Sequence, residues 1–290
     1  MHRKSARAAA RPNASAWSAL RGMAWPVLLI ATCLFACGAL DAPAAAPIDA
    51  PTWGRVAFGP GDADFVGAID LTAVREDPVF GPLVEHLARN DDLGVLTRAS
   101  QIDLVARVEQ GRAVSWIAVI HGVDGSPSRS DVGSSAAEVV TAPGAWVLGE
   151  GPAFEQVRAS PSLASPRVAL PERALFASTV RGRAIPRPRE TELFDLTEGL
   201  EQATMVILGG AHLQIVVRCR YFDAAAARHA ATAAKLVLVA EAARTDAVSE
   251  LARALGRLDF DASGNDVSVR VTLSDDLREL LQRYVERAAK

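Results

Sequence analysis

Several residue types are scarce in this 290-residue chain, and each shortage excludes a class of protein. Lysine occurs three times among 31 basic residues, while acidic residues number 34, so the formal net charge is −3. Nucleic-acid binding depends on phosphates neutralised by lysine and arginine, so this balance argues against nucleic acid as a partner. Half of the residues are hydrophobic, which excludes disorder of the whole chain and is enough for one large or two small cores.

Long hydrophobic runs are also missing. The longest apolar run covers 14 residues from Met23 to Ala36, and it follows a basic stretch without acidic residues. As a helix it would span about 21 Å, against about 30 Å for a hydrocarbon core. A basic region followed by a short apolar run is typical of a secretory signal segment. We therefore interpret residues 1–36 as a signal peptide, and the remainder carries 26 basic and 34 acidic side chains.

A cysteine ends this run, in the sequence Leu34-Phe35-Ala36-Cys37. These residues resemble the lipobox of bacterial lipoprotein precursors. The resemblance implies that Cys37 becomes the first residue of the mature chain, with a diacylglycerol on its thiol and a further acyl chain, such as palmitate, on its amine. Two or three acyl chains anchor a protein stably to a membrane. The alternatives are an ordinary signal peptide cleaved near Ala42-Pro43-Ala44, with Cys37 lost, an uncleaved anchor, and a cytosolic protein.

The residues after the cysteine give a location and a spacing. Gly38 stands where aspartate would retain an enterobacterial lipoprotein at the inner membrane. We therefore expect a cell-envelope protein at the outer membrane, on its periplasmic face or at the cell surface, with a soluble secreted or periplasmic protein as the alternative. Residues 37–61 are rich in proline and alanine and are expected to form an extended tether.

From residue 62 onward, short apolar runs alternate with helical patterns and predict an α+β fold of antiparallel β-hairpins packed with helices. Hairpins are expected over 102–120, 203–222 and 256–273. Helices are expected over 78–89, 152–160 and 223–255, the last of them broken near 244–246, with a final amphipathic helix capped by Ser274. The stretch 160–173 is the best internal boundary. It divides the body into two similar α+β units, at 62–165 and 172–290.

Two loops are similar to ligand-binding motifs but depart from them. Residues 259–270 match a calcium loop through Asp259, Asp261 and Ser263, yet Arg270 stands where a bidentate glutamate belongs. We interpret this segment as a hairpin turn.

The sequence Leu148-Gly149-Glu150-Gly151-Pro152-Ala153-Phe154 lies where a dinucleotide-binding loop would follow a strand. Phe154 replaces the third glycine, and Glu150 would repel a pyrophosphate. We expect a turn with Pro152 near the start of a helix, and no cofactor.

The remaining candidates are isolated side chains. The five histidines show no metal-ligand spacing, so no metal is expected, and His121 and His212 are interpreted as turn residues beside glycines. Cys219 shares a strand face with apolar residues and is interpreted as a small core residue. It has no disulfide partner when Cys37 is acylated. A local basic patch is interpreted as a solvated loop, with phosphate or lipopolysaccharide binding as the alternative; its members are Arg181, Arg183, Arg187 and Arg189.

No catalytic or cofactor motif is complete, so Cys37 is the one site residue assigned, and no catalytic residue is named. The sequence predicts a lipid-anchored envelope protein that acts by binding or assembly, with the membrane and an envelope protein as partners. The alternatives are a secreted or anchored hydrolase whose residues converge only in the fold, and a solute-binding or sensory module. Segments such as "DFVGAIDL", "AVIHG" and "GAWVLGEG" resemble secreted proteins and lipoproteins of GC-rich, myxobacterial-type bacteria, which implies no known activity.

Overall fold

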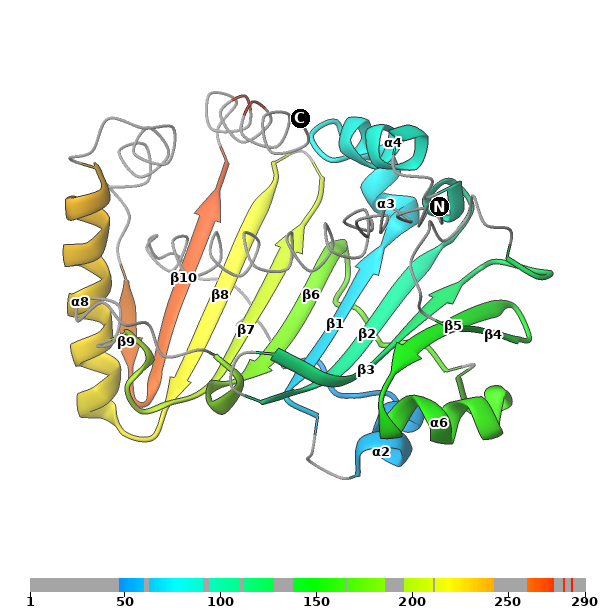
Figure 1. Cartoon of the computed structure of the whole chain (residues 1–290). Helices are drawn as coiled ribbons and strands as arrows, with labels where there is room; N and C mark the ends of the chain where they lie inside the picture. Colours follow the sequence, from blue (N-terminus) through cyan, green and yellow to red (C-terminus); the bar gives the residue numbers. More distant parts are fainter. Residues whose placement is uncertain are drawn as a thin grey trace, which may run out of the picture.

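A single ten-stranded antiparallel sheet organises the protein (Figure 1). The computed structural model describes residues 47–59, 63–90, 94–109, 112–127, 138–164, 166–185, 196–210, 212–242 and 260–273, together with 279 and 283. The strand order is β4-β5-β3-β2-β1-β6-β7-β8-β10-β9. The α+β class expected from the sequence is confirmed.

The two halves of the sheet have the same topology. The first contains β1 (Phe65–Asp70), β2 (Gln101–Glu109), β3 (Arg112–His121), β4 (Glu138–Ala142) and β5 (Ala145–Glu150). The second contains β6 (Ala174–Arg181), β7 (Leu200–Leu208), β8 (Gln214–Tyr221), β9 (Asp261–Ser263) and β10 (Asp266–Thr272). Counted outward from the central β1–β6 pair, each half places its first, second, third, fifth and fourth strand in that order. The expectation of two similar units therefore holds at the level of topology, within one continuous sheet.

The hairpins form where alternating apolar residues meet turn residues. β2 pairs with β3, β7 with β8, and β9 with β10, so the three predicted hairpins are confirmed. In the last of them Gly264 and Asn265 form a two-residue turn, and Gly264, with φ of 57°, supplies the positive φ that such turns require at their first position. Strand β4 was not predicted, because its five residues follow a Gly/Ser-rich stretch.

Helices and single turns pack against the sheet, with α8 beside β9 and α6 beside β5 (Figure 1). They are α2 (Thr52–Phe58), α3 (Leu71–Glu76), α4 (Gly81–Asn90), η1 (Gly94–Thr97), α6 (Pro152–Ala159), η2 (Pro161–Ala164), η3 (Gly182–Ala184) and α8 (Ala224–Ala242). The prediction of one helix over 78–89 is wrong in its boundaries. Asp77, held in an extended conformation before Pro78, ends α3, and its Oδ1 accepts the N–H of Val79 at 2.9 Å before α4 begins. No helix within the described ranges is long and apolar enough to cross a membrane.

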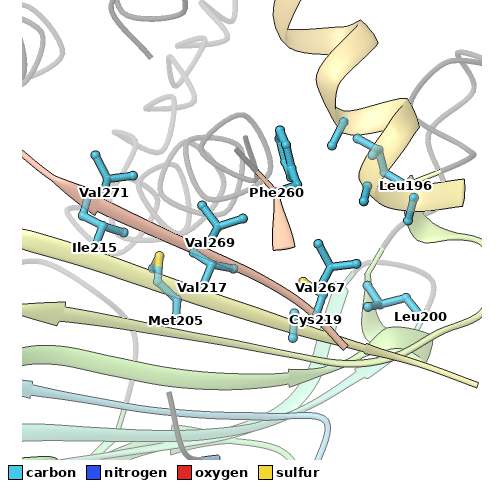
Figure 2. Close-up of a cluster of buried hydrophobic side chains, with 14 of the residues drawn as sticks. Leu196, Leu200, Met205, Ile215, Val217, Cys219, Phe260, Val267, Val269 and Val271 are labelled. Carbon is cyan, nitrogen blue, oxygen red and sulfur yellow. The ribbon is translucent and has the colours of Figure 1, made fainter. Parts of the chain in front are cut away.

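We name the two sides of the sheet after the helices that cover them. On the α8 face, β8 and β10 direct Val217, Cys219 and Val269 toward Phe260 and the alanines of α8 (Figure 2). The buried alanines of α8 are Ala227, Ala230, Ala231, Ala233 and Ala234, whose small side chains let the helix lie close to the strands. The α8 face therefore carries a tightly packed apolar core.

On the α6 face, α6 contacts β3 and β5, and α2 contacts α6. Trp53, Phe154 and Val157 fill the layer between these helices and the strands. The same cluster includes Val66 and Val105 from the first half of the sheet and Val206 and Val216 from the second. The segments expected as units at 62–165 and 172–290 thus share both a sheet and a core.

The predicted tether of residues 37–61 needs correction. Residues 52–58 form α2, and Trp53 within it is fully buried, with its Nε1 donating to Pro166 O at 3.0 Å. Ile48 is buried as well, and its N–H donates to Thr179 Oγ1 at 3.0 Å. A tryptophan and an isoleucine supply enough apolar surface to dock this segment despite its prolines. The break expected in the helix near 244–246 and the final helix from Ser274 lie outside the described residues, apart from 279 and 283.

Candidate functional site

A buried polar network lies on the α6 face, where apolar side chains surround it. Strand β2 contributes Gln101 and Asp103 two residues apart, and β3 contributes His121 directly opposite Gln101. Asp103 is fully buried and His121 is 2% exposed. The Nε2 atom of His121 lies 2.8 Å from Asp103 Oδ2, and Gln101 Nε2 donates to Asp103 Oδ1 at 2.7 Å.

The connector between the two halves completes this network. The backbone N–H of Val168 donates to Asp103 Oδ2 at 2.9 Å, and the Val168 carbonyl accepts from Gln101 Nε2, also at 2.9 Å. Gln101 and Val168 donate to this carboxylate, and Nε2 of His121 lies within hydrogen-bond distance of it, as a donor in the tautomer that carries its proton there. Buried carboxylates persist when their oxygens are satisfied in this way.

The chemistry of this pair differs from that of a hydrolytic site. An aspartate that holds an imidazole is one part of the triads used in acyl transfer. Here both side chains are buried, and the nearby Ser100 hydroxyl donates to the backbone carbonyl of His121 at 3.2 Å. The network fastens the connector to the sheet, and it offers a substrate no exposed nucleophile. The interpretation of His121 as a turn residue is wrong, because it is the last residue of β3 and its ring is enclosed.

Two of the four arginines of the predicted basic patch, Arg181 and Arg183, belong to the described residues. Arg183 donates from Nε to Asp64 Oδ1 at 2.5 Å, and the 3%-exposed Asp64 also accepts the N–H of Val108 at 2.9 Å. Arg183 therefore compensates a buried carboxylate at the junction of β1, β2 and β6. Arg181 is the last residue of β6, whereas Arg187 and Arg189 lie outside the described residues.

The two loops compared with ligand sites are turns, as expected. Gly151, with φ of 88°, precedes α6, and Pro152 is the first residue of that helix. A Cβ on Gly149 would lie 2.5 Å from Trp116 O, so this glycine serves close packing of strands. The calcium-like segment contains β9, a turn and β10. Within the described residues, no group of three or more acidic, histidine or cysteine side chains is arranged to hold a metal ion.

Cys219 is a core residue on the α8 face, which confirms its interpretation (Figure 2). Burial raises the pKa of its thiol well above the ordinary value, and the negative charge of Asp266 adds to the effect. Such a thiol is a poor nucleophile, because thiolate is the reactive form. His212 lies exposed at a bend between β7 and β8, as predicted for a turn residue. Cys37, the assigned lipidation site, is outside the described residues.

Sequence reasoning missed the Asp103–His121 pair, although a signal for it exists. The stretch Gln101-Ile102-Asp103-Leu104-Val105 alternates polar and apolar residues before becoming apolar. The register of the predicted hairpin places Gln101 opposite His121 and Asp103 opposite Val119. Diagonal neighbours on one face are within reach of long side chains, so the hairpin alone brings the three polar residues together.

Comparisons with known proteins add little to this description. No protein-family model matches the chain, and no curated protein matches it. Among solved structures, the chain is similar to one described as "Structure of crystal form I of TP0453", with a TM-score of 0.44 and 13% sequence identity. The match covers 84% of this chain and 100% of that chain. This likeness carries no argument about function.

Proposed function

We propose that the protein is a lipid-anchored cell-envelope protein that acts by binding or assembly, attached to the membrane through acyl chains on Cys37. The observation that carries the proposal is the position of this cysteine. It directly follows a basic stretch and a 14-residue apolar run, in a sequence that resembles a lipobox. The run is about a third shorter than a helix that spans the bilayer, so it suits export and cleavage better than retention in the membrane.

The start of the folded body supports a close attachment. Pro47, the first described residue, lies ten positions after Cys37, and Ile48 is bound to the sheet through Thr179. At up to about 3.5 Å per residue, this link reaches at most about 35 Å. The body would therefore stay near the membrane surface, roughly half as far as a tether reaching residue 61 would allow.

A role in binding or assembly agrees with the buried polar chemistry. The hydrogen-bonding atoms of Asp103 are occupied by Gln101, His121 and the connector at Val168. The hydrolase alternative needs an imidazole that can reach a substrate, and His121 is 2% exposed. The imidazole of His121 is held against Asp103 and is enclosed, which favours a structural role for this histidine.

Intact-mass analysis of the protein expressed in a bacterial host tests the anchor. The expected mature chain begins at Cys37 and carries two or three acyl chains, and it fractionates with membranes. Cys37→Ala should abolish acylation and processing at this position, whereas Cys33→Ala, four residues earlier in the same run, should be processed normally. A mature chain without acyl mass, beginning near Ala44, would overturn the proposal.

The proposed outer-membrane location has a separate test. In an enterobacterial host, Gly38→Asp should move the acylated protein from the outer to the inner membrane fraction. A Gly38→Ser variant, which keeps a small residue after the cysteine, serves as the control. An identical distribution of the parent protein and the two variants between the membrane fractions would contradict sorting by this residue. It would not contradict the proposed lipid anchor.

A further inference from the structure

A group of charged side chains projects from the α6 face of the second half of the sheet. β8 contributes Arg218 and Arg220, and β10 contributes Asp266 and Arg270. Alternate residues of a strand point to the same side, and Val216, which precedes Arg218 by two residues, belongs to the core cluster of the α6 face. In the register of the pair, Asp266 lies opposite Arg220, and Arg270 lies opposite Val216. The four charged side chains therefore lie on one face, where Arg270 is a diagonal neighbour of Arg218.

One aspartate organises two of the three arginines. Arg218 donates from Nη2 to Asp266 Oδ2 at 2.5 Å, and Arg220 donates from Nε to Asp266 Oδ1 at 3.2 Å. Burial alone would raise the pKa of Asp266, but the hydrogen bonds and charges of the two arginines outweigh it and leave this pKa below its ordinary value. The carboxylate is thus ionised at neutral pH, and it holds the two guanidinium groups side by side.

The Nε donor of Arg270, in the same group, has no acceptor within the described residues. In the part of the chain that the structure describes, its Nε is the one buried side-chain nitrogen or oxygen without a hydrogen-bond partner. Buried donors in folded proteins almost always have an acceptor. Three guanidinium groups against two carboxylates, Asp266 and Asp261, which lies opposite Ser268, also leave one net positive charge on this surface. Both observations indicate an anionic acceptor that is not part of the described chain.

The first half of the sheet shows what the same place looks like when a helix covers it. The third and fifth strands of that half, β3 and β5, present Ile117, Val119 and Val147 on the α6 face, and α6 packs on these two strands. The third and fifth strands of the second half are β8 and β10. They present Arg218, Ser268 and Arg270 on that face instead. The second half therefore has the same topology as the first, but its third and fifth strands present guanidinium and hydroxyl donors where the first half presents apolar side chains.

We propose that Arg218, Arg220, Arg270 and Ser268 bind a phosphate group. A guanidinium presents paired N–H donors that match two phosphate oxygens, and Ser268, opposite Arg218, adds a hydroxyl donor between the arginines. The excess of positive charge favours an anion, and a phosphate monoester carries about −1.5 to −2 at neutral pH. Free phosphate and the phosphate of a lipid headgroup share this chemistry. The site does not depend on the proposed anchor.

Titration calorimetry of the purified full chain in a neutral detergent, with inorganic phosphate as the probe and ionic strength fixed by chloride, tests the site. We expect saturable binding of one phosphate per chain. Arg270→Gln should weaken it at least tenfold, and Arg270→Lys, which keeps the charge without the planar fork, should weaken it less. Arg228→Gln removes the same charge from an exposed position of α8 and should change the affinity less than twofold.

A second titration with micelles containing phosphatidic acid or phosphatidylcholine distinguishes the two sources. Tighter binding to phosphatidic acid than to inorganic phosphate, lost in Arg270→Gln, assigns a lipid headgroup, and the reverse order assigns free phosphate. Absence of saturable binding to both probes, or equal losses in Arg270→Gln and Arg228→Gln, would overturn the proposal. Thermal unfolding of each variant verifies that it is folded. Cys37→Ala should bind phosphate normally, so failure of the anchor and failure of this site are separate results.

Discussion

The carboxylate of Asp103 accepts a hydrogen bond from the backbone N–H of Val168, 65 residues further along the chain. Asp103 belongs to β2 in the first half of the sheet, and Val168 belongs to the connector that leads to β6 in the second. One buried aspartate therefore fixes the path between the halves, together with Gln101 and His121.

Replacing this aspartate should be costly. Asp103→Ala leaves the donors of Gln101, His121 and Val168 without their acceptor, and we expect a loss of about 3–5 kcal/mol in the free energy of unfolding. Asp103→Asn keeps an acceptor oxygen and should lose less. Urea denaturation followed by circular dichroism measures both, and Asp261→Ala, at an exposed position of β9, should stay within about 0.5 kcal/mol of the parent protein. Equal stabilities for the two alanine variants would contradict the assigned role.

Gly182 should tolerate no side chain. It begins η3, and a Cβ there would lie 1.6 Å from Leu200 O and 2.5 Å from Leu200 C, both backbone atoms that cannot rotate away. We expect Gly182→Ala to destabilise the protein by about 2 kcal/mol or more in thermal or urea unfolding. Gly125→Asn is the matched control, since nothing lies within 4 Å of a Cβ there and asparagine tolerates its φ of 77°.

Helix α2 should be protected from proteolysis as part of the body. The exposed side chain of Arg55 offers trypsin a cleavage residue, but its backbone lies in a helix held by the buried Trp53. Brief digestion should leave the bond after Arg55 intact. Trp53→Ala should open it to cleavage, whereas Val56→Ala, at a half-exposed position of the same helix, should not. Rapid cleavage after Arg55 in the parent protein would show that the segment is a tether after all.

Cys219 should react slowly with alkylating reagents. Burial raises the pKa of its thiol and keeps reagent away, so iodoacetamide at pH 8 should label it over hours in the folded protein and within minutes in concentrated guanidinium chloride. Peptide mass mapping identifies the labelled cysteine. A Ser263→Cys variant places a reference thiol on exposed β9 and should be labelled within minutes in the folded state. Equal rates at the two positions would contradict the burial of Cys219.

Local patterns were sufficient to predict the hairpins. The β9–β10 turn was recognisable because polar residues around Gly264 separate runs that alternate in polarity, and Val267, Val269 and Val271 all lie on the α8 face. The same alternation placed Cys219 in the core. A hairpin depends on contacts between residues that are close in the sequence, so a local sequence pattern is enough to predict it.

Contacts between distant segments were not predictable in this way. Nothing near Trp53 in the sequence shows that Pro166 will accept its indole N–H, so its segment looked like a tether. Arg183 looked solvated because its partner, Asp64, lies 119 residues away. The phosphate site that we propose likewise needs the β8–β10 register, since Arg218 and Arg270 become neighbours only when the two strands pair.

The central position of β1 has a consequence for how the protein folds. β1 is the first strand in the described part of the chain, yet one of its edges is completed by β2 and the other by β6, whose residues lie more than 100 positions later. Until β6 arrives, a half-built sheet presents an open edge that the β6 of another molecule could equally well complete. Exchange of second halves between two chains, with the connector around Val168 as the hinge, is therefore the characteristic misassembly of this architecture. The hydrogen bonds that Asp103 and Gln101 make to that connector oppose it, because they direct the chain back onto its own sheet.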